Sequence, residues 1–460
     1  MTDPAQPAEP AASALGGASP RPASPIWRNW DRQQRCAPER ILRPRSEEEL
    51  VEAVGSAARV KVAGSGHSFS DIACTDGLML DLSEMRRVLS VDGSDVTVEA
   101  GITLRELGEE LRARGLAMEN QGDVDPQTVA GAISTATHGT GGSFSNLSAQ
   151  VVGVRLVDGR GELQQITEGD ELRAARVSLG ALGAISAVTL RCVPAFTIHR
   201  IDEPQGLDDL LPRLDELVDA HDHWEAFVMP YTRRALTLTS ARTDRHPEPP
   251  GKAKAYVHDV VLENAALGLS CRLGRRFPGL IPRLNGALAS LMGRAEHLDA
   301  SNRIYANVRL VRFTEMEYGI PREHAAAALE RTLDLIGRRR LPVGFPIELR
   351  VVAPDDALLS TAQGRPTAYI AVHQYLGMEY ESYFRGVEAI MNDYGGRPHW
   401  GKRHYQSAAT LAARYPEWER FAEIRARLDP EGRFENDYTR RVLGPVGALS
   451  GSAEAGTGRA

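Results

Sequence analysis

Residues 61–70 read Lys-Val-Ala-Gly-Ser-Gly-His-Ser-Phe-Ser, a β-branched strand end that runs into a turn of glycine and serine around one histidine. Gly64 and Gly66 allow positive φ and let the backbone approach a ligand with no Cβ in the way. Successive N–H groups of such a turn can face inward and bind a pyrophosphate. His67 would then lie beside the group that carries the pyrophosphate. The alternative is a tight turn with a solvated histidine, and the other segments decide between the two.

The length and charge of the chain limit the classes of protein to which it can belong. A chain of 460 residues is too long for one ordinary core, so we expect two domains. A net charge of −7 argues against nucleic acid as a partner. Four scattered cysteines show no metal-binding spacing and no disulfide framework, which indicates a reducing, cytoplasmic setting. The sequence has no run of 18 apolar residues, so it predicts no transmembrane helix.

Three stretches differ from the rest in composition. Residues 1–25 are rich in Ala, Pro, Ser and Gly, and we expect a disordered tail and not a signal peptide. A second disordered tail is expected over 445–460. Residues 262–297 combine Leu and Ala with five arginines. A solvated helical face is the favoured interpretation there, and contact with an anionic membrane surface is the alternative.

Short strands and turns dominate up to Pro194, where we place a domain boundary. Thr103 is positioned to N-cap a helix over 104–114, and Gly115 to end it. The turn Asp158-Gly-Arg-Gly161 predicts a hairpin. Strands are predicted over residues 60–63, 78–82, 88–91, 96–100, 151–157, 162–166 and 184–193.

Longer helices appear in the segment 195–395. Strands are predicted over 224–229, 309–313, 347–352 and 368–374, and the clearest helices over 324–338 and 380–394. Because strands and helices do not alternate strictly, we expect an antiparallel sheet with helices on one face.

A second run of small residues spans Gly131-Ala-Ile-Ser-Thr-Ala-Thr-His-Gly-Thr-Gly-Gly142. Its hydroxyls add polarity without bulk, so a flat polar ligand could lie against the backbone. A small-residue strand packed on a helix is the alternative. Two such segments in one domain argue jointly for one large cofactor, although the dinucleotide motif GxGxxG is absent.

Several motifs carry a resemblance to a known family. Ala63-Gly-Ser-Gly-His-Ser-Phe69, Thr135-Ala-Thr-His-Gly-Thr140 and Ser178-Leu-Gly-Ala-Leu-Gly183 together resemble the FAD domain of the vanillyl-alcohol oxidase superfamily. Other motifs resemble the sugar-lactone branch of this superfamily, which comprises aldonolactone oxidoreductases and alditol oxidases. These motifs are Glu348-Leu-Arg350, Arg397-Pro-His-Trp-Gly-Lys402 and Asp429-Pro-Glu-Gly-Arg-Phe-Glu-Asn436.

This resemblance implies an α+β flavoprotein of two domains. A PCMH-type FAD-binding domain would span 26–194, and a cap or substrate domain with an antiparallel sheet and flanking helices would span 195–395. The segment 396–444 would return to the FAD site.

The resemblance also assigns FAD contacts. FAD would be attached covalently to His67 through the flavin 8α-methyl group, since a neutral imidazole is nucleophilic. Such a link raises the redox potential and prevents loss of the cofactor. No metal is implied. The positions matched to FAD are Ala63, Gly64, Ser65, Gly66, His67, Ser68, Gly122, Asp123, Thr128, Gly131, Thr135, Thr137, His138 and Ile185. Asp123 departs from the serine of some relatives.

At the substrate end, Glu348 and Arg350 alternate on one strand and so share a face. A surface ion pair is the alternative. The resemblance makes Glu348 an acceptor for substrate hydroxyls and their proton, while Arg350 stays protonated and stabilises negative charge. Lys402 would favour the anionic reduced flavin. His373 matches a substrate-lining position, with a structural histidine as the alternative.

The implied reaction oxidises a gulono- or arabinono-1,4-lactone to an ascorbate-like product, with hydride transfer to flavin N5. The electron acceptor would be O₂ or a cytochrome or quinone-like carrier, and Gly122 resembles the oxidase pattern because glycine leaves room for O₂. An alditol oxidase is the second hypothesis, and a flavin- or sugar-binding protein without turnover is the third.

Overall fold

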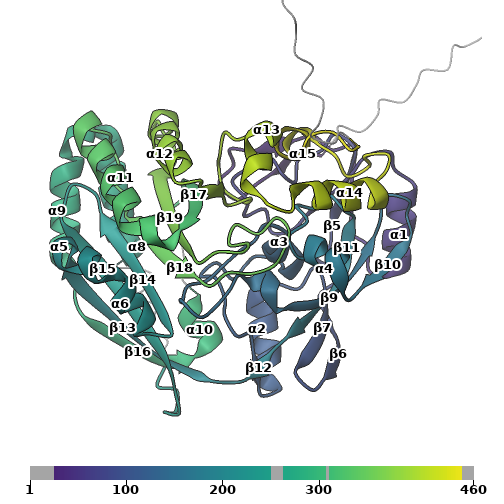
Figure 1. Ribbon diagram of the computed structural model, residues 1–460, viewed down its shortest axis with the longest axis horizontal. Helices are drawn as coiled ribbons and strands as arrows, with labels where there is room; N and C mark the ends of the chain where they lie inside the picture. Colours follow the sequence, from purple (N-terminus) through teal and green to yellow (C-terminus); the bar gives the residue numbers. More distant parts are fainter. Residues whose placement is uncertain (1–24, 250–262, 307–309, 448–460) are drawn as a thin grey trace, which may run out of the picture.

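The computed structural model describes residues 25–249, 263–306 and 310–447 (Figure 1). Almost all of the two expected tails lies outside these residues, as does Leu262. The described chain forms two adjoining halves, and the C-terminal helices lie over the N-terminal half (Figure 1). The α+β architecture expected from the sequence is confirmed.

The first half is built on two main sheets. A three-stranded parallel sheet has the order β3-β5-β4, and a five-stranded antiparallel sheet has the order β10-β9-β11-β7-β6. Their strands are β3 (Arg40–Leu42), β4 (Val60–Ala63), β5 (Leu78–Asp81), β6 (Val88–Asp92), β7 (Asp95–Glu99), β9 (Val151–Val157), β10 (Leu163–Ile166) and β11 (Ala184–Arg191). Short pairs link β1 (Trp27–Arg28) with β2 (Arg35–Cys36) and β8 (Leu116–Ala117) with β12 (Val193–Pro194).

Local signals explain several of these elements. The helices of this half are α1 (Glu47–Gly55), α2 (Leu104–Ala113), α3 (Val129–Ser134) and α4 (Gly169–Arg176). Thr103 caps α2 through a capping box with Glu106, and Gly115 follows the cap at a φ of 72°, as expected. Buried Asp158 accepts the N–H groups of Arg160 and Glu162 and so fixes the β9–β10 hairpin.

The second half is one eight-stranded antiparallel sheet, as predicted, in the order β16-β13-β15-β14-β18-β19-β17-β20. The strands are β13 (Thr197–Gly206), β14 (His223–Met229), β15 (Arg234–Thr243), β16 (Ala295–Ala300), β17 (Phe313–Pro321), β18 (Ile347–Val352), β19 (Thr367–Tyr375) and β20 (Arg397–Pro398). The helices are α5 (Leu207–Leu210), α6 (Leu214–Asp219), α8 (Glu263–Arg276), α9 (Ile281–Leu291), α10 (Ser301–Tyr305), α11 (Ala325–Arg339) and α12 (Glu381–Asp393).

The strand predicted over 309–313 was misplaced. Arg309 lies outside the described residues, and β17 starts at Phe313 and continues to Pro321. The prediction stopped at the point where the strand acquires two glutamates, Glu315 and Glu317, which are buried in the fold. Strand patterns normally exclude buried carboxylates, because an unpaired buried charge is costly.

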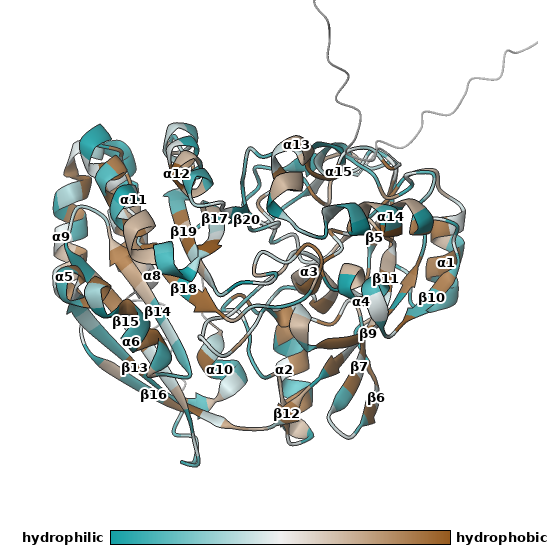
Figure 2. Cartoon of the chain, viewed as in Figure 1, coloured by the Kyte–Doolittle hydropathy of each residue, from teal (hydrophilic) through white to brown (hydrophobic). Residues whose placement is uncertain are grey.

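The two faces of the eight-stranded sheet differ in chemistry. Alternate residues of β17, β18 and β19 such as Met316, Leu349 and Val372 pack with α5, α6, α11 and α12 in one apolar core. The residues between them, among which are Glu348, Arg350 and His373, point to the opposite face. Figure 2 shows hydrophobic and hydrophilic residues side by side in these strands. Because Arg350 on this polar face contacts Asp123 of the first half, the polar face is the one that looks toward the first half.

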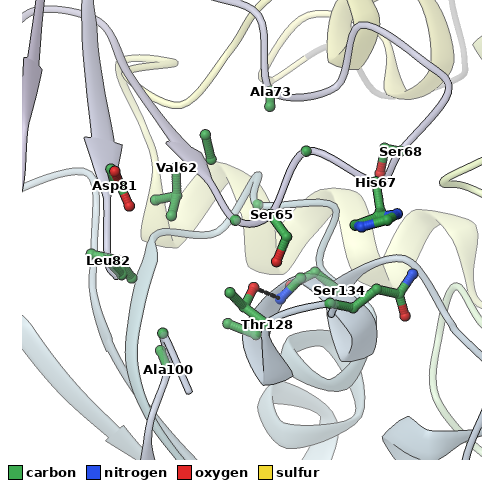
Figure 3. A pocket seen from close by; sticks show the side chains of 18 of the residues that line it. Val62, Ser65, His67, Ser68, Ala73, Asp81, Leu82, Ala100, Thr128 and Ser134 are labelled. Atoms are coloured by element: carbon green, nitrogen blue, oxygen red, sulfur yellow. Dashed lines mark hydrogen bonds between the residues drawn. The ribbon is translucent and has the colours of Figure 1, made fainter. Parts of the chain in front are cut away.

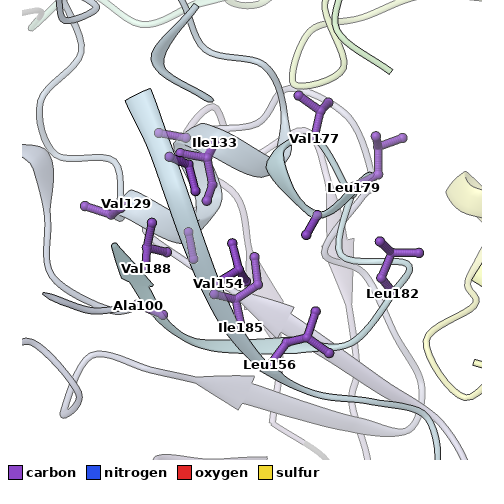
Figure 4. Packing of buried hydrophobic residues seen from close by; sticks show 14 of the residues in the cluster. Ala100, Val129, Ile133, Val154, Leu156, Val177, Leu179, Leu182, Ile185 and Val188 are labelled. Atoms are coloured by element: carbon purple, nitrogen blue, oxygen red, sulfur yellow. The ribbon is translucent and has the colours of Figure 1, made fainter. Parts of the chain in front are cut away.

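A second apolar core fills the first half. Figure 4 shows Ile133 and Val129 of α3 packed over Val154, Ile185 and Val188 of the five-stranded sheet. Residues from far along the chain join this core, in the β18–β19 loop and in α13 (Ala408–Leu411), α14 (Trp418–Leu428) and α15 (Asp437–Leu443). The domain boundaries at 194, 395 and 444 stay a prediction.

Lys61 on β4 ties the C-terminal segment to the first half. Its Nζ is buried and donates to the carbonyls of Phe434, at 2.9 Å, and Gly180, at 3.4 Å. Burial lowers the pKa of Lys61 from 10.5 to about 7.

Replacing Lys61 by methionine is expected to change how stability depends on pH. Between pH 7 and 10.5 the unfolded chain holds a proton on this lysine that the folded chain has lost, so wild-type stability gains from a rise in pH. The Met variant lacks this gain. Urea unfolding at pH 7 and pH 9.5 should show the difference between wild type and variant growing with pH, and a pH-independent difference would contradict the shift.

Candidate active site

A cavity of about 420 Å³ opens where β4 ends. Ten of the residues matched to FAD line it: Ala63, Gly64, Ser65, Gly66, His67, Ser68, Thr128, Gly131, Thr135 and Ile185. Figure 3 shows Ser65 and His67 of the loop facing Thr128 and Ser134 of the α3 region. The other four matched positions, Gly122, Asp123, Thr137 and His138, do not line this cavity.

The loop has the geometry that an anion site requires. Gly66 has a φ of +70°, and its carbonyl accepts the N–H of Trp30 at 2.7 Å. A Cβ on Gly64 would lie 2.4 Å from Oγ1 of Thr128, so only glycine lets the loop approach α3 this closely. Within the described residues, the backbone N–H groups from Gly64 to Ser68 donate to no protein acceptor. A row of unengaged donors beside this cavity fits the pyrophosphate of FAD.

His67 is half-buried at the end of this loop. Its ring stacks on Trp30, with 5.6 Å between the ring centroids. Burial, together with the nearby charge of Lys402, lowers the pKa of His67 to about 4. The imidazole is therefore neutral at physiological pH, which is the state that can act as a nucleophile.

Arg350 is the centre of a buried charge cluster on the polar sheet face. Its Nε lies 2.7 Å from a carboxylate oxygen of Glu225, and its Nη2 lies 3.1 Å from Asp123 and 3.2 Å from Glu348. Burial opposes the charge of Arg350, but the three carboxylates outweigh it and raise its pKa well above the usual value. Burial raises the pKa of Glu225. Asp123, which the resemblance matched to an FAD contact, therefore forms an ion pair with Arg350, the arginine that the resemblance assigned to the substrate.

A second chain of contacts joins Lys402 and His373 to this cluster. Nζ of Lys402 lies 2.5 Å from Glu315, and Nε2 of His373 lies 3.5 Å from Glu315 and 3.7 Å from Glu348. Nδ1 of His373 lies 3.2 Å from the carbonyl of Pro346, so Nδ1 carries a proton. The four residues predicted as catalytic therefore lie in one connected network.

His138 belongs to a third group, with Glu317 and His399. Ligand atoms of these three side chains lie within 4.8 Å of one another, a spacing that could hold a metal ion. However, Nδ1 of His399 accepts the N–H of Gly401 at 3.1 Å, so its proton lies on Nε2 and neither nitrogen offers a lone pair. The hydrogen bonds thus favour a polar network here. His138 stacks on Tyr369 at 3.6 Å and contacts Glu317 at 3.2 Å.

Gly122 packs against this group. A Cβ there would lie 2.9 Å from the carbonyl of His138 and 3.2 Å from Cγ2 of Thr137. The space beside Gly122 is filled by the protein, so the expectation that it leaves room for O₂ has no support in the packing. Glycine is needed because two backbone segments meet at this point.

Sequence reasoning missed Glu225, Glu315 and Glu317. A signal existed for the last two: Glu315-Met-Glu317 alternates acid and apolar residues inside an apolar strand, the same pattern as Glu348-Leu-Arg350. For Glu225 there was none, because only the pairing of β14 with β18 sets it opposite Arg350.

Loop and sheet together fit one class of protein, the two-domain flavoprotein oxidoreductases of the vanillyl-alcohol-oxidase type. The loop presents unengaged N–H groups beside a cavity, and the sheet face carries a buried cluster of charged side chains. Among the described residues, no helix is long and apolar enough to cross a bilayer.

Comparison with known proteins agrees with this class. The D-arabinono-1,4-lactone oxidase family matches residues 188–442, and the FAD binding domain family matches residues 38–167. The chain belongs to the D-arabinono-1,4-lactone oxidase family. The resemblance drawn from the sequence motifs is thereby confirmed.

Individual relatives cover nearly the whole chain. L-gulono-1,4-lactone dehydrogenase of Mycobacterium tuberculosis (strain ATCC 25618 / H37Rv) is 57% identical, over 92% of this chain and 100% of the relative. L-gulonolactone oxidase of Bos taurus is 34% identical, over 91% and 98%. Alditol oxidase of a Streptomyces species is 32% identical, over 90% and 98%. A solvent-stable cholesterol oxidase structure has a TM-score of 0.77 at 18% identity, over 92% and 98%, and shares the fold.

Proposed function

We propose that the protein oxidises a sugar-1,4-lactone, of the gulono- or arabinono- type, in an FAD-dependent reaction that gives an ascorbate-like product. The observation that carries this proposal is the buried network from Lys402 to Arg350, which offers groups suited to hydroxyls and whose Lys402 end lies near His67 of the loop. The relatives named for gulono-1,4-lactone and gulonolactone support the substrate class.

Each residue of the network has a proposed role. Bound FAD supplies the hydride acceptor at its N5. Arg350 and Glu348 orient the hydroxyls of the lactone, and Arg350 stabilises negative charge on the reacting oxygen. We assign the hydroxyl proton to Nε2 of His373, because Nδ1 already donates to Pro346 while Glu348 shares its charge with Arg350. The carboxylates of Glu315 and Glu348 would stabilise the imidazolium that forms.

The test is anaerobic reduction of the purified yellow protein by a panel of substrates. Gulono-1,4-lactone and arabinono-1,4-lactone should bleach the flavin absorbance, and xylitol should not. Faster bleaching by xylitol would favour the alditol oxidase, for which the Streptomyces relative is the precedent. A purified protein that is colourless and cannot be loaded with FAD would overturn the proposal.

For the second half-reaction we propose an electron carrier other than O₂, of the cytochrome or quinone type. Two observations support this proposal. Protein atoms fill the space beside Gly122. The relative from Mycobacterium tuberculosis, which is 57% identical, is named as a dehydrogenase. Reduced protein should be reoxidised faster by cytochrome c or a soluble quinone than by air-saturated buffer in a stopped-flow experiment. The reverse order would restore the oxidase interpretation.

We propose a cytoplasmic location with peripheral membrane contact through α8 and α9. All four cysteines are free, in keeping with a reducing compartment. Four arginines of these helices, Arg272, Arg275, Arg276 and Arg283, are exposed. Figure 2 shows hydrophobic and hydrophilic residues together along α8. Exposed apolar side chains accompany the arginines, at Leu269, Leu273, Phe277, Leu280 and Leu291.

Replacing Phe277 by aspartate is expected to weaken binding to anionic vesicles about tenfold, since half of an aromatic side chain no longer enters the lipid. The measurement is co-sedimentation with vesicles of phosphatidylserine and phosphatidylcholine. Leu163→Asp is the matched control, because Leu163 is 45% exposed, Phe277 is 49% exposed, and Leu163 lies on β10 in the other half. Wild-type protein that stays in the supernatant would show that this face is simply solvated.

A further inference from the structure

Strand β17 places two buried carboxylates, Glu315 and Glu317, on the polar face of the sheet. Glu315 is the register partner of His373 on β19. Its main-chain carbonyl accepts the N–H of Arg403 at 2.9 Å, so the same residue also holds the turn that follows Trp400-Gly401. Glu315 therefore contacts both the sheet and the returning C-terminal segment.

The side chain of Glu315 is buried and contacts both Lys402 and His373. Oε2 lies 2.5 Å from Nζ of Lys402, and Oε1 lies 3.5 Å from Nε2 of His373. Burial alone raises the pKa of Glu315, but the charge of Lys402 and the contact with His373 bring it down to about 2. The carboxylate is thus ionised throughout the physiological range and carries a full negative charge next to Lys402.

Glu315 provides the short ion pair of Lys402. On its other side Nζ faces the ring of Phe69, 5.2 Å from the centroid, and Phe69 N–H donates to the carbonyl of Gly401 at 2.7 Å. Its side chain is only 18% exposed, so little water is available to replace Glu315. A lysine side chain is long and flexible, and a single short ion pair is enough to select one of its conformations.

We propose that Glu315 is a positioning residue that holds Lys402 against the flavin-binding loop, so that the lysine charge acts on the bound flavin. This inference rests on the function proposed above. It predicts that Glu315 acts through Lys402 and has little effect when the lysine is absent.

A double-mutant cycle tests the coupling. Glu315→Asp keeps the charge but withdraws the carboxylate by one methylene. In the Lys402 background it is expected to make flavin reduction tenfold less favourable, a fall of about 30 mV in midpoint potential. In the Lys402→Met background it should leave the potential unchanged. Equal shifts in both backgrounds, or no shift in either, would overturn the inference. Glu315→Gln in the same cycle provides a second estimate of the coupling between Glu315 and Lys402. The direct effect of losing the Glu315 charge on the flavin occurs in both backgrounds, so it cancels in the difference.

A second measurement does not use the flavin at all. The chain has four lysines, at 61, 252, 254 and 402, so amine labelling is readily assigned by mass spectrometry. Glu315→Asp should increase reductive methylation of Lys402 several-fold and leave that of Lys61 unchanged. Unchanged labelling of Lys402 would also count against the inference.

Glu388→Asp is the matched control, since Glu388 is a buried carboxylate on α12, over the opposite face of the sheet, where it accepts the Tyr318 hydroxyl and the N–H of Tyr405. It should change neither the potential nor the labelling. Failure of the underlying function is distinguishable: wild-type protein would then bind no flavin, or no lactone would reduce it. If the lactone reduces the wild-type protein but the effects of the two substitutions are additive, only the role of Glu315 is contradicted.

Discussion

Replacing Arg350 by lysine is expected to lower the rate of flavin reduction by the lactone roughly 100- to 1,000-fold, the loss that follows removal of one donor to a developing oxyanion. The reason is geometric. The guanidinium engages Glu225, Asp123 and Glu348 at once, at 2.7 to 3.2 Å. A lysine ammonium is a point charge without the planar fork, and it cannot reach three carboxylates on different elements while also facing a substrate.

Charge loss at this position should also affect stability. Arg350→Met would leave three nearly buried carboxylates without their cation, which typically costs about 3–5 kcal/mol. Thermal unfolding of both variants separates the two effects, because Arg350→Lys keeps the charge and should be destabilised less than Arg350→Met.

Arg200→Lys is a suitable control for the kinetic loss. Arg200 forms a comparably shielded pair with Asp202 at 2.9 Å, on β13 at the far side of the sheet order. In the Arg200→Lys variant, the lactone should reduce the flavin at the wild-type rate. Stopped-flow reduction of Arg350→Lys within threefold of wild type would mean that Arg350 has only a structural role.

The parts of the site that could be predicted are those encoded in short stretches. The loop at 64–68 carries its own evidence, since glycines and a histidine at that spacing restrict backbone and chemistry locally. Glu348 and Arg350 were paired correctly because alternation on a strand is a local rule. Their shared face is indeed opposite the one that packs with α5, α6, α11 and α12.

Pairings between distant strands could not be predicted. The partner of Lys402 is Glu315, 87 positions earlier, and only the register of β17 with β19 and β20 brings them together. Asp123 was matched to FAD by position in a motif, yet the fold turns it toward Arg350. Strands β13 and β15 were missed because polar residues interrupt their apolar pattern.

Replacing His67 by alanine is expected to release the FAD. After acid precipitation of the wild-type protein, the yellow colour should stay with the pellet, and in the variant it should move to the supernatant. The proposed bond requires a neutral imidazole nitrogen. Since burial lowers the pKa of His67 to about 4, that state predominates at any pH above 5. Attachment should therefore be insensitive to pH between 6 and 8, unlike that of an ordinary histidine.

The variant also separates attachment from binding. The N–H groups of Gly64 to Ser68 do not depend on the imidazole, so His67→Ala should still bind FAD reversibly when the cofactor is in excess. Loss of the bond should lower the midpoint potential, with about 30 mV for each tenfold loss in the reduction equilibrium. His324→Ala, on the helix-covered side near α11, is the control and should keep its colour in the pellet. If wild-type colour also leaves the pellet, the bond to His67 is absent and the histidine only packs against Trp30.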